Sequence, residues 1–290
     1  MRAAFFGLAL TTLALALAAT ATGGPSAPVQ VGSCAKPNLD LVEEGRLTLA
    51  TSNPSFPPWW GGGETRKPWK LANPYSGKGF ESAVAYAVAR QLGFPKGQVD
   101  WRAVPFDQSF RPGNKNFDFY LAQVSYTPER ARTVDFSNAY YFVFQSLVGR
   151  EGSPITQARS IADLKGYRLG AQLGTTSFQY IDRYIKPSQK PLVYDSNDLA
   201  VQALQNGQLD GIVVDMPTAF YVTGVQVENS TIVGRFPSQG ARERFGMVFE
   251  KGSTLRRCVN RAINRLWANG TIKKLQNRTL PSGTELRVLR

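Results

Sequence analysis

Short apolar runs alternate with longer segments of helical periodicity along most of this chain. Residues 47–51 and 99–104 are two such runs, and each predicts a strand. Between them, apolar side chains recur at the spacing of one helix face, at Phe80, Val84, Val88 and Leu92. Two further strands are expected at residues 118–125 and 140–149.

The same alternation starts again after about residue 150. The run at 209–214 is almost unbroken and apolar, which is typical of a strand covered on both faces. The elements expected in this half are a helix at 161–166, a strand at 168–172, helices at 177–185 and 198–206, the strand at 209–214, and an amphipathic helix at 256–275.

Strands that alternate with helices of about ten to fifteen residues indicate an α/β fold with parallel sheets. The restart of the pattern, near residues 148–154, predicts two such units. Parallel sheets bind ligands in the loops beyond the carboxyl ends of their strands. Functional residues are therefore expected at the strand ends.

The N-terminus differs in composition from the rest of the chain. Arg2 precedes an apolar run at 3–19, and Ala19-Thr20-Ala21 fits the small-residue cleavage site of a secretory signal. We therefore expect residues 1–21 to be a signal peptide and residues 22–37 to be a flexible mature terminus. An uncleaved membrane anchor is the alternative, because about nineteen apolar residues just span a bilayer.

The two cysteines, Cys34 and Cys258, are expected to form a disulfide, because an exported protein meets oxidising conditions. Two unrelated buried thiols are the alternative. Cys34 also follows Val31-Gly32-Ser33, which faintly resembles a lipoprotein box, but it lies far beyond the apolar run.

Charge and composition exclude several classes of function. The formal net charge is +13, yet Lys and Arg are dispersed among Asp and Glu, and no nucleic-acid-binding motif is present. The chain has no histidine, which rules out Ser-His-Asp and Cys-His sites and argues against zinc. The glycine-rich segments fit neither a P-loop nor a dinucleotide fingerprint. No cofactor is expected, and the usual tools of an enzyme are missing.

Two charged residues stand at predicted strand ends. Thr127 before Pro128 predicts a helix N-cap, so Arg130 falls in the first turn, where a cation opposes the helix dipole and suits a bound carboxylate. Asp215 ends the apolar run at 209–214 and suits a cation. Together they suggest a zwitterionic ligand; a surface salt bridge or a cap is the alternative for each.

Several segments resemble family 3 of the bacterial extracellular solute-binding proteins, the polar amino-acid-binding proteins of ABC transporters. The resemblance covers nearly the whole mature chain, and its most specific part is TPER, VDFS and YY followed by LGTTS. The segments that carry it are LTLATSNPSFPPWW, GKGFESAVAYAVARQLGF, SYTPERARTVDFSNAYY, DLKGYRLGAQLGTTS, ALQNGQLDGIVVD and FGMVFEKGSTLRRCVNRAINRLWANGTIKKL.

The resemblance implies a two-lobed periplasmic-binding-protein fold of type II, in which two hinge strands join the lobes. Lobe 1 would comprise residues 38–147 plus 239–290, and lobe 2 residues 148–238. It also implies that Arg130, helped by Ser125 and by the turn Thr175-Thr176, binds the α-carboxylate of an amino acid. Asp215 would then bind the α-ammonium group.

Other positions implied by the resemblance bear on the ligand side chain. Phe56 and Phe106 match positions that flank it, with ordinary core packing as the alternative. Ser52 and Asn53 stand where several members that bind cationic amino acids have an acidic residue, which argues against lysine or arginine. Gln172 and Gln123 suit a neutral polar side chain, because amides both donate and accept hydrogen bonds. An aromatic pocket formed by Trp59 and Trp60 is the alternative.

We therefore expect an exported, monomeric binding protein that delivers a polar, uncharged amino acid to a membrane permease and performs no chemistry on it. Two alternatives share the scaffold. One is a periplasmic enzyme resembling cyclohexadienyl or prephenate dehydratases, with Glu81 or Asp215 as its acid. The other is an amino-acid sensor tethered by an uncleaved N-terminus.

Overall fold

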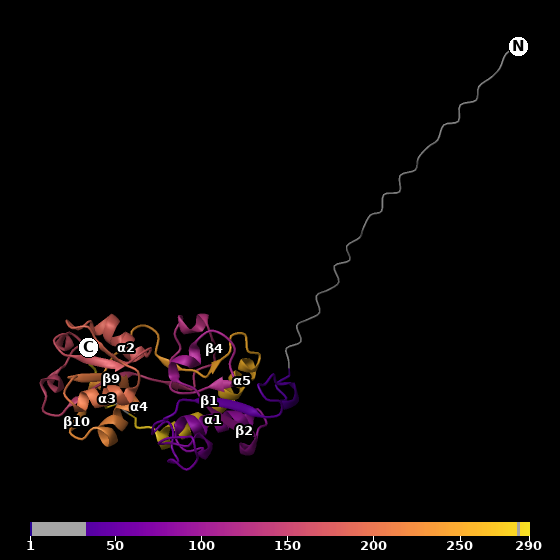
Figure 1. Ribbon diagram of the computed structural model, residues 1–290, viewed down its shortest axis with the longest axis horizontal. Helices are drawn as coiled ribbons and strands as arrows, with labels where there is room; N and C mark the ends of the chain where they lie inside the picture. The colour runs from indigo at the N-terminus through magenta and orange to yellow at the C-terminus, as the bar shows by residue number, and fades with distance from the viewer. Residues whose placement is uncertain (2–32, 283–284) are drawn as a thin grey trace. The chain divides into compact units, whose positions relative to one another are not determined.

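The computed structural model describes Met1, residues 33–282 and residues 285–290 (Figure 1). Apart from Met1, the predicted signal peptide at 1–21 lies outside the described residues, as does most of the predicted flexible terminus at 22–37. Within the described part of the chain, no helix is long and apolar enough to cross a membrane.

Five strands in the order β2-β1-β3-β12-β4 form the first sheet. β1 pairs in parallel with β2 and β3, whereas β12 runs antiparallel to β3 and β4. The strands are β1 (Leu47–Thr51), β2 (Val99–Ala103), β3 (Phe119–Tyr120), β4 (Asp135–Phe136) and β12 (Val248–Phe249).

Three helices pack on one face of the first sheet and on each other: α1 (Phe80–Gln91), α5 (Leu255–Ala268) and α6 (Thr271–Thr279). Figure 1 shows yellow α5 beside the indigo and purple elements of the first half, although they are far apart in sequence. The shared core joins Leu47 and Leu49 of β1 with Val84 and Val88 of α1 and Val259 of α5. The apolar spacing of α1 therefore predicted its buried face correctly.

Five strands in the order β10-β6-β9-β7-β8 form the second sheet. Here β7 is parallel to β8 and β9, while β6 is antiparallel to β9 and β10. The strands are β6 (Gln145–Arg150), β7 (Leu169–Gln172), β8 (Leu192–Tyr194), β9 (Gly211–Asp215) and β10 (Ser230–Arg235).

Both faces of the second sheet are covered. Val213 of β9 packs in one cluster with Ile181, and its neighbours Ile212 and Val214 pack in another with Leu204. The unbroken apolar run of β9 is thereby explained, because each alternate side chain meets a helix. The covering helices are α2 (Thr176–Tyr180), which continues as the π-helix η8 (Ile181–Ile185), α3 (Asn197–Gln205), and α4 (Met216–Tyr221), which continues as η9 (Val222–Gln226).

Two short strands connect the sheets. β5 (Tyr141–Phe142) precedes β6, β11 (Arg244–Phe245) precedes β12, and the two pair with each other in antiparallel fashion. The remaining elements are the 3-10 helices η1 (Lys36–Asn38), η2 (Pro74–Ser76), η3 (Lys96–Gln98), η4 (Phe106–Phe110), η5 (Arg130–Arg132), η6 (Pro154–Gln157) and η7 (Ala162–Leu164).

Four predicted elements differ from the structure. The helix expected at 161–166 is only the three-residue 3-10 helix η7. The strand expected at 118–125 is only the two-residue β3, and the strand expected at 140–149 is divided between β5 and β6. The helix expected at 256–275 is broken into α5 and α6 at Gly270, whose φ of 74° is left-handed. Glycine adopts that conformation without the steric cost of a side chain.

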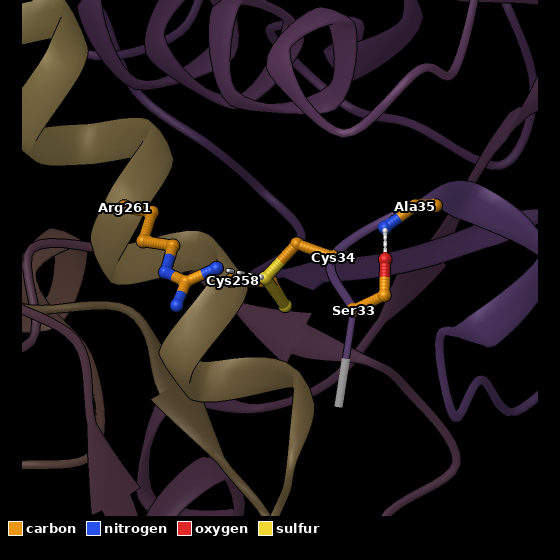
Figure 2. The surroundings of a disulfide bond; sticks show 5 residues. All are labelled: Ser33, Cys34, Ala35, Cys258 and Arg261. Carbon is orange, nitrogen blue, oxygen red and sulfur yellow. Dashed lines mark hydrogen bonds between the residues drawn. A yellow bond between two sulfur atoms is a disulfide. The ribbon is translucent and has the colours of Figure 1, made fainter. Parts of the chain in front are cut away.

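The predicted disulfide between Cys34 and Cys258 is present, with 5.4 Å between the Cα atoms (Figure 2). Cys258 lies on α5, so the bond fastens the start of the described range 33–282 to the helices of the first sheet. Arg261, one turn further along α5, donates to Sγ of Cys34 at 3.6 Å.

The C-terminal residues join the second sheet. Val288 forms a parallel bridge with Arg235 of β10, and Leu289 packs in the cluster beneath that sheet. Leu280, by contrast, packs in the cluster of the first sheet. The predicted lobe boundaries group all of residues 239–290 with lobe 1, whereas Arg287 and Leu289 form backbone hydrogen bonds with Arg235 of the second sheet.

Candidate functional site

A cavity of about 510 Å³ opens where polar loops follow strands of both sheets. Its first-sheet wall comes from the segments after β1, β2 and β3, and its second-sheet wall from the ends of β7 and β9. All eleven residues predicted from sequence as ligand-binding line it: Ser52, Asn53, Phe56, Phe106, Gln123, Ser125, Arg130, Gln172, Thr175, Thr176 and Asp215. Their contact with a ligand remains a prediction.

Arg130 is the buried cation of this cavity and is 7% exposed. Nη1 donates to the carbonyl oxygen of Ser125 at 2.6 Å, and Nη2 donates to that of Gly174 at 2.7 Å. The guanidinium also lies over the ring of Phe110, 4.5 Å from its centroid. Burial lowers the pKa of Arg130 to about 10, and the charge of Glu243 opposes that shift. Arg130 therefore stays charged at neutral pH while facing no carboxylate within ion-pair distance among the described side chains.

The local structure around Arg130 corrects one prediction. Arg130 begins the three-residue 3-10 helix η5, not the third position of an α-helix. Thr127 still acts like a cap, because its Oγ1 accepts from the backbone N–H of Arg130 at 3.2 Å. So short a helix has no appreciable dipole, so no opposed dipole acts on Arg130. Burial and carbonyl contacts position the guanidinium instead.

Asp215 lies at the opposite wall, at the end of β9. It is the N-cap of α4, where Oδ1 accepts from the backbone N–H of Thr218 at 3.1 Å and Oδ2 from its hydroxyl at 2.9 Å. Burial raises the pKa of Asp215 to about 6, against the two bonds from Thr218 that lower it. No Lys or Arg of the described chain forms an ion pair with it. Asp215 thus offers a carboxylate with spare acceptor capacity.

A cluster of hydroxyl and amide groups joins the two walls. Oε1 of Glu243 accepts from the hydroxyl of Ser125 at 2.5 Å and from that of Thr176 at 2.6 Å. Gln145 donates its amide to both oxygens of Glu243, at 3.1 and 3.0 Å. Its own Oε1 accepts from the hydroxyl of Ser177 at 2.6 Å. Glu243 and Gln145 were not identified from the sequence.

Gln123 is held at the cavity wall by a buried carboxyl. Its φ of 53° is unusual for a residue with a side chain, and both its backbone N–H and its amide donate to Glu81. Trp60 Nε1 and the Tyr140 hydroxyl donate to the same carboxyl, which is 0% exposed. Burial raises the pKa of Glu81 to about 7 against these four hydrogen bonds.

The other predicted residues have local partners. Ser52 bonds the Tyr120 hydroxyl at 2.7 Å, and Asn53 bridges backbone atoms of Pro68 and Lys70. The Thr175 hydroxyl caps α2 by accepting from Phe178 N–H, while Gln172 makes a 3.4 Å contact with the Asp195 carbonyl oxygen. The aromatic pairs are Phe56 with Tyr221, at 6.4 Å between centroids, and Phe106 with Phe110, at 5.4 Å.

Two further acidic residues line the cavity, Asp195 and Asp198. Asp198 accepts from the amide of Gln226 at 3.1 Å, and burial raises its pKa. They lie at and just before the start of α3, where the residue pattern indicates only the start of a helix. Together with Asp215 they make the lining of the cavity more acidic than the sequence predicted. No cluster of metal-ligating side chains was found in the described chain.

The chain is similar in sequence and in architecture to several known proteins. The sequence model of the bacterial extracellular solute-binding proteins, family 3, matches residues 60–281. The L-arginine-binding protein of Pseudomonas aeruginosa is 30% identical over 216 residues, which cover 69% of this chain and 78% of that protein. The glutamine-binding protein GlnH of Bacillus subtilis is 28% identical over 204 residues, covering 69% and 72%.

Among solved structures, an ancestral arginine-binding protein bound to arginine matches with a TM-score of 0.66 and 29% identity. The match covers 82% of this chain and 99% of that one. The predicted fold class, a two-lobed α/β protein of the type II periplasmic-binding-protein kind, is thereby confirmed. The relatives are binding proteins and not enzymes, as predicted for this chain.

Proposed function

We propose that this chain, which belongs to the bacterial extracellular solute-binding proteins of family 3, captures a free amino acid in the cavity between its two sheets. The observation that carries the proposal is the convergence of Arg130 and Asp215 on one cavity from opposite walls. Each is buried or half-buried, and neither has an oppositely charged side-chain partner within ion-pair distance in the described chain. A carboxylate at Arg130 and an ammonium group at Asp215 would complete both, because buried charges require partners.

The two walls suggest how binding and conformation are coupled. Ser125 and Arg130 belong to the part of the chain that builds the first sheet, whereas Thr176 and Asp215 follow strands of the second. A ligand that first meets one wall gains the contacts of the other only when the walls approach. Such differential contacts shift a hinge equilibrium toward the ligand-bound form. The paired connecting strands β5 and β11 are the natural hinge.

Charge in the cavity bears on the ligand side chain. Gln123 and Gln172 suit a polar, uncharged side chain, as the sequence suggested. If the ligand's own carboxylate and ammonium neutralise Arg130 and Asp215, the carboxylates of Asp195 and Asp198 remain in the lining. These favour a cationic side chain as a second candidate. The arginine-binding and glutamine-binding relatives correspond to the two candidates.

The surroundings of Glu81 argue against the alternative of a dehydratase-like enzyme. That carboxyl is fully buried and accepts four hydrogen bonds, so it has no free position from which to protonate a substrate in the cavity. The two hydrogen bonds from Thr218 favour the ionised form of Asp215, which can accept an ammonium group but has no proton to donate to a substrate. Binding without chemistry therefore accounts better for these residues.

The biological setting follows from the family and from the expected signal peptide at 1–21. We place the protein outside the cytoplasmic membrane, as a monomer that passes its ligand to the permease of an ABC transporter. In this setting the disulfide between Cys34 and Cys258 meets the oxidising conditions in which such bonds persist.

The test is thermal unfolding of the purified protein, freed of ligand by refolding, against each of the twenty amino acids. A ligand at about one hundred times its dissociation constant adds about 2.7 kcal/mol and raises the melting temperature by a few degrees. Arg130→Ala should weaken binding by about 2–5 kcal/mol, as truncation of a buried charge pair does. Arg132→Ala, an exposed arginine of the same 3-10 helix, is the matched control and should bind normally. Near-native affinity of a folded Arg130→Ala protein would refute the assignment.

A further inference from the structure

The carboxylate of Glu243 occupies the polar cluster that joins the two walls. It is half-buried, and its backbone is fixed because the carbonyl oxygen accepts from the N–H of Val143 at 3.1 Å. The hydroxyls of Ser125 and Thr176 both donate to Oε1, and the amide of Gln145 donates to both oxygens. The charge of Glu243 also acts on Arg130, whose pKa it raises against burial. The carboxylate of Glu243 is thus held by several groups that would also suit the carboxylate of a bound ligand.

These groups cannot serve two carboxylates at once. A hydroxyl has a single proton to donate, and in Ser125 and Thr176 that proton is directed at Glu243. Toward the cavity, the two hydroxyls present only lone pairs, which repel a carboxylate. An amino acid whose carboxylate binds at Arg130, Ser125 and Thr176 must therefore first displace Glu243.

The structure provides a place for the displaced side chain. Glu243 lines a second cavity of about 430 Å³, and Thr176 and Gln145 line both cavities. Three arginines line the second cavity, Arg183, Arg242 and Arg244, and none forms an ion pair with another described residue. Arg242 and Arg244 instead lie over the rings of Phe144 and Tyr126. A carboxylate that leaves the hydroxyls would meet cations there.

We infer that Glu243 is a built-in competitor for the carboxylate site, which sets the affinity and rate of ligand capture. The inference rests on the proposed function, because it assigns Ser125 and Thr176 to the ligand's carboxylate. In the ligand-free protein Glu243 satisfies these donors. On binding, the ligand carboxylate replaces it, and Glu243 turns toward the arginines of the second cavity.

The first experiment compares ligand affinities by isothermal titration calorimetry. Glu243→Gln removes the charge at nearly constant shape, and Glu243→Ala removes the competing group. Each should bind the amino acid found in the thermal panel about tenfold more tightly than the wild type, since the charge-assisted hydrogen bonds from Ser125 and Thr176 to Glu243 no longer have to be broken. Glu129→Gln, an exposed glutamate that lines the second cavity, makes the same charge change and should bind like the wild type. Unchanged or weaker binding by both Glu243 variants would overturn the inference while leaving the proposed function intact.

The second experiment uses acetate as a carboxylate probe and needs no amino-acid ligand. Acetate should raise the melting temperature of Glu243→Ala relative to sodium chloride of equal ionic strength, and it should leave the wild type unchanged. Equal responses of the two proteins would overturn the inference. Failure of every amino acid to stabilise the wild type and both variants would instead refute the proposed function.

Discussion

The buried carboxyl of Glu81 predicts how the stability of the protein changes between pH 5 and 8. Burial raises its pKa from 4.5 to about 7. Among its donors, the Tyr140 hydroxyl can also accept a hydrogen bond, so the protonated carboxyl keeps a partner by reversing that bond. The folded protein therefore retains a proton on Glu81 at pH values where the unfolded chain has released it.

The sign and size of the effect follow from proton linkage. Where the folded state binds more protons than the unfolded state, the free energy of unfolding falls as the pH rises. The contribution of Glu81 is complete below pH 4.5 and is lost as the pH rises through about 7. The difference between these two pKa values corresponds to about 3 kcal/mol. No histidine titrates in the same window, because the sequence has none.

The assay is urea denaturation followed by tryptophan fluorescence at several pH values from 5 to 8, for the wild type and for Glu81→Gln. Burial also raises the pKa of Asp118 and of Asp215 to about 6. Both residues therefore lower the free energy of unfolding as the pH rises, and they do so equally in the wild type and in the variant. The difference between the two proteins therefore isolates Glu81. The wild type should lose about 3 kcal/mol more than the variant over this range. Identical pH dependence of the two proteins, or a wild type that gains stability toward pH 8, would refute the reasoning.

Two further predictions concern the disulfide and the role of Asp215 in binding. Replacing both Cys34 and Cys258 by serine should lower the free energy of unfolding by up to about 5 kcal/mol, because the bond closes a loop with a sequence separation of 224. The reduced wild type should show the same loss in denaturation, and a loss below about 1 kcal/mol would contradict the estimate. Asp215→Asn keeps a good N-cap for α4, so the protein should fold, yet it should bind the amino acid more weakly. Titration with the analogue that lacks the ammonium group is the control, and an equal loss for that analogue would contradict the role of Asp215.

The residues at strand ends could be predicted because local sequence determines where a strand stops. Asp215 follows an unbroken apolar run, and Gly174-Thr175-Thr176 follows the strand β7. In a sheet with parallel strands such ends gather at one edge and line one cavity. Their proximity could therefore be predicted without knowledge of the tertiary structure. The cap pattern at Thr127 and Pro128 singled out Arg130, and the family resemblance implied the same residue. The helix expected there was wrong in type, because η5 is a 3-10 helix that starts at Arg130.

Glu243 and Gln145 could not be predicted in this way. Glu243 stands between two arginines in a polar segment, which by itself indicates a solvated surface. Its contact with Gln145 spans 98 residues and depends on the pairing of β5 with β11. Gln145 lay within the single strand expected at 140–149, and only the division of that run between β5 and β6 places it at the cavity. Long-range pairing of two-residue strands leaves little signal in the sequence.

The C-terminal segment has a mechanical consequence for any opening of the molecule. Leu280 is anchored in the core of one half and Leu289 in the core of the other, so the chain between them is a strap in addition to the two connecting strands. Nine residue steps span at most about 30 Å when fully extended. The strap therefore acts as a stop that limits how far the halves can swing apart, unless the pairing of Arg287–Leu289 with β10 is released first.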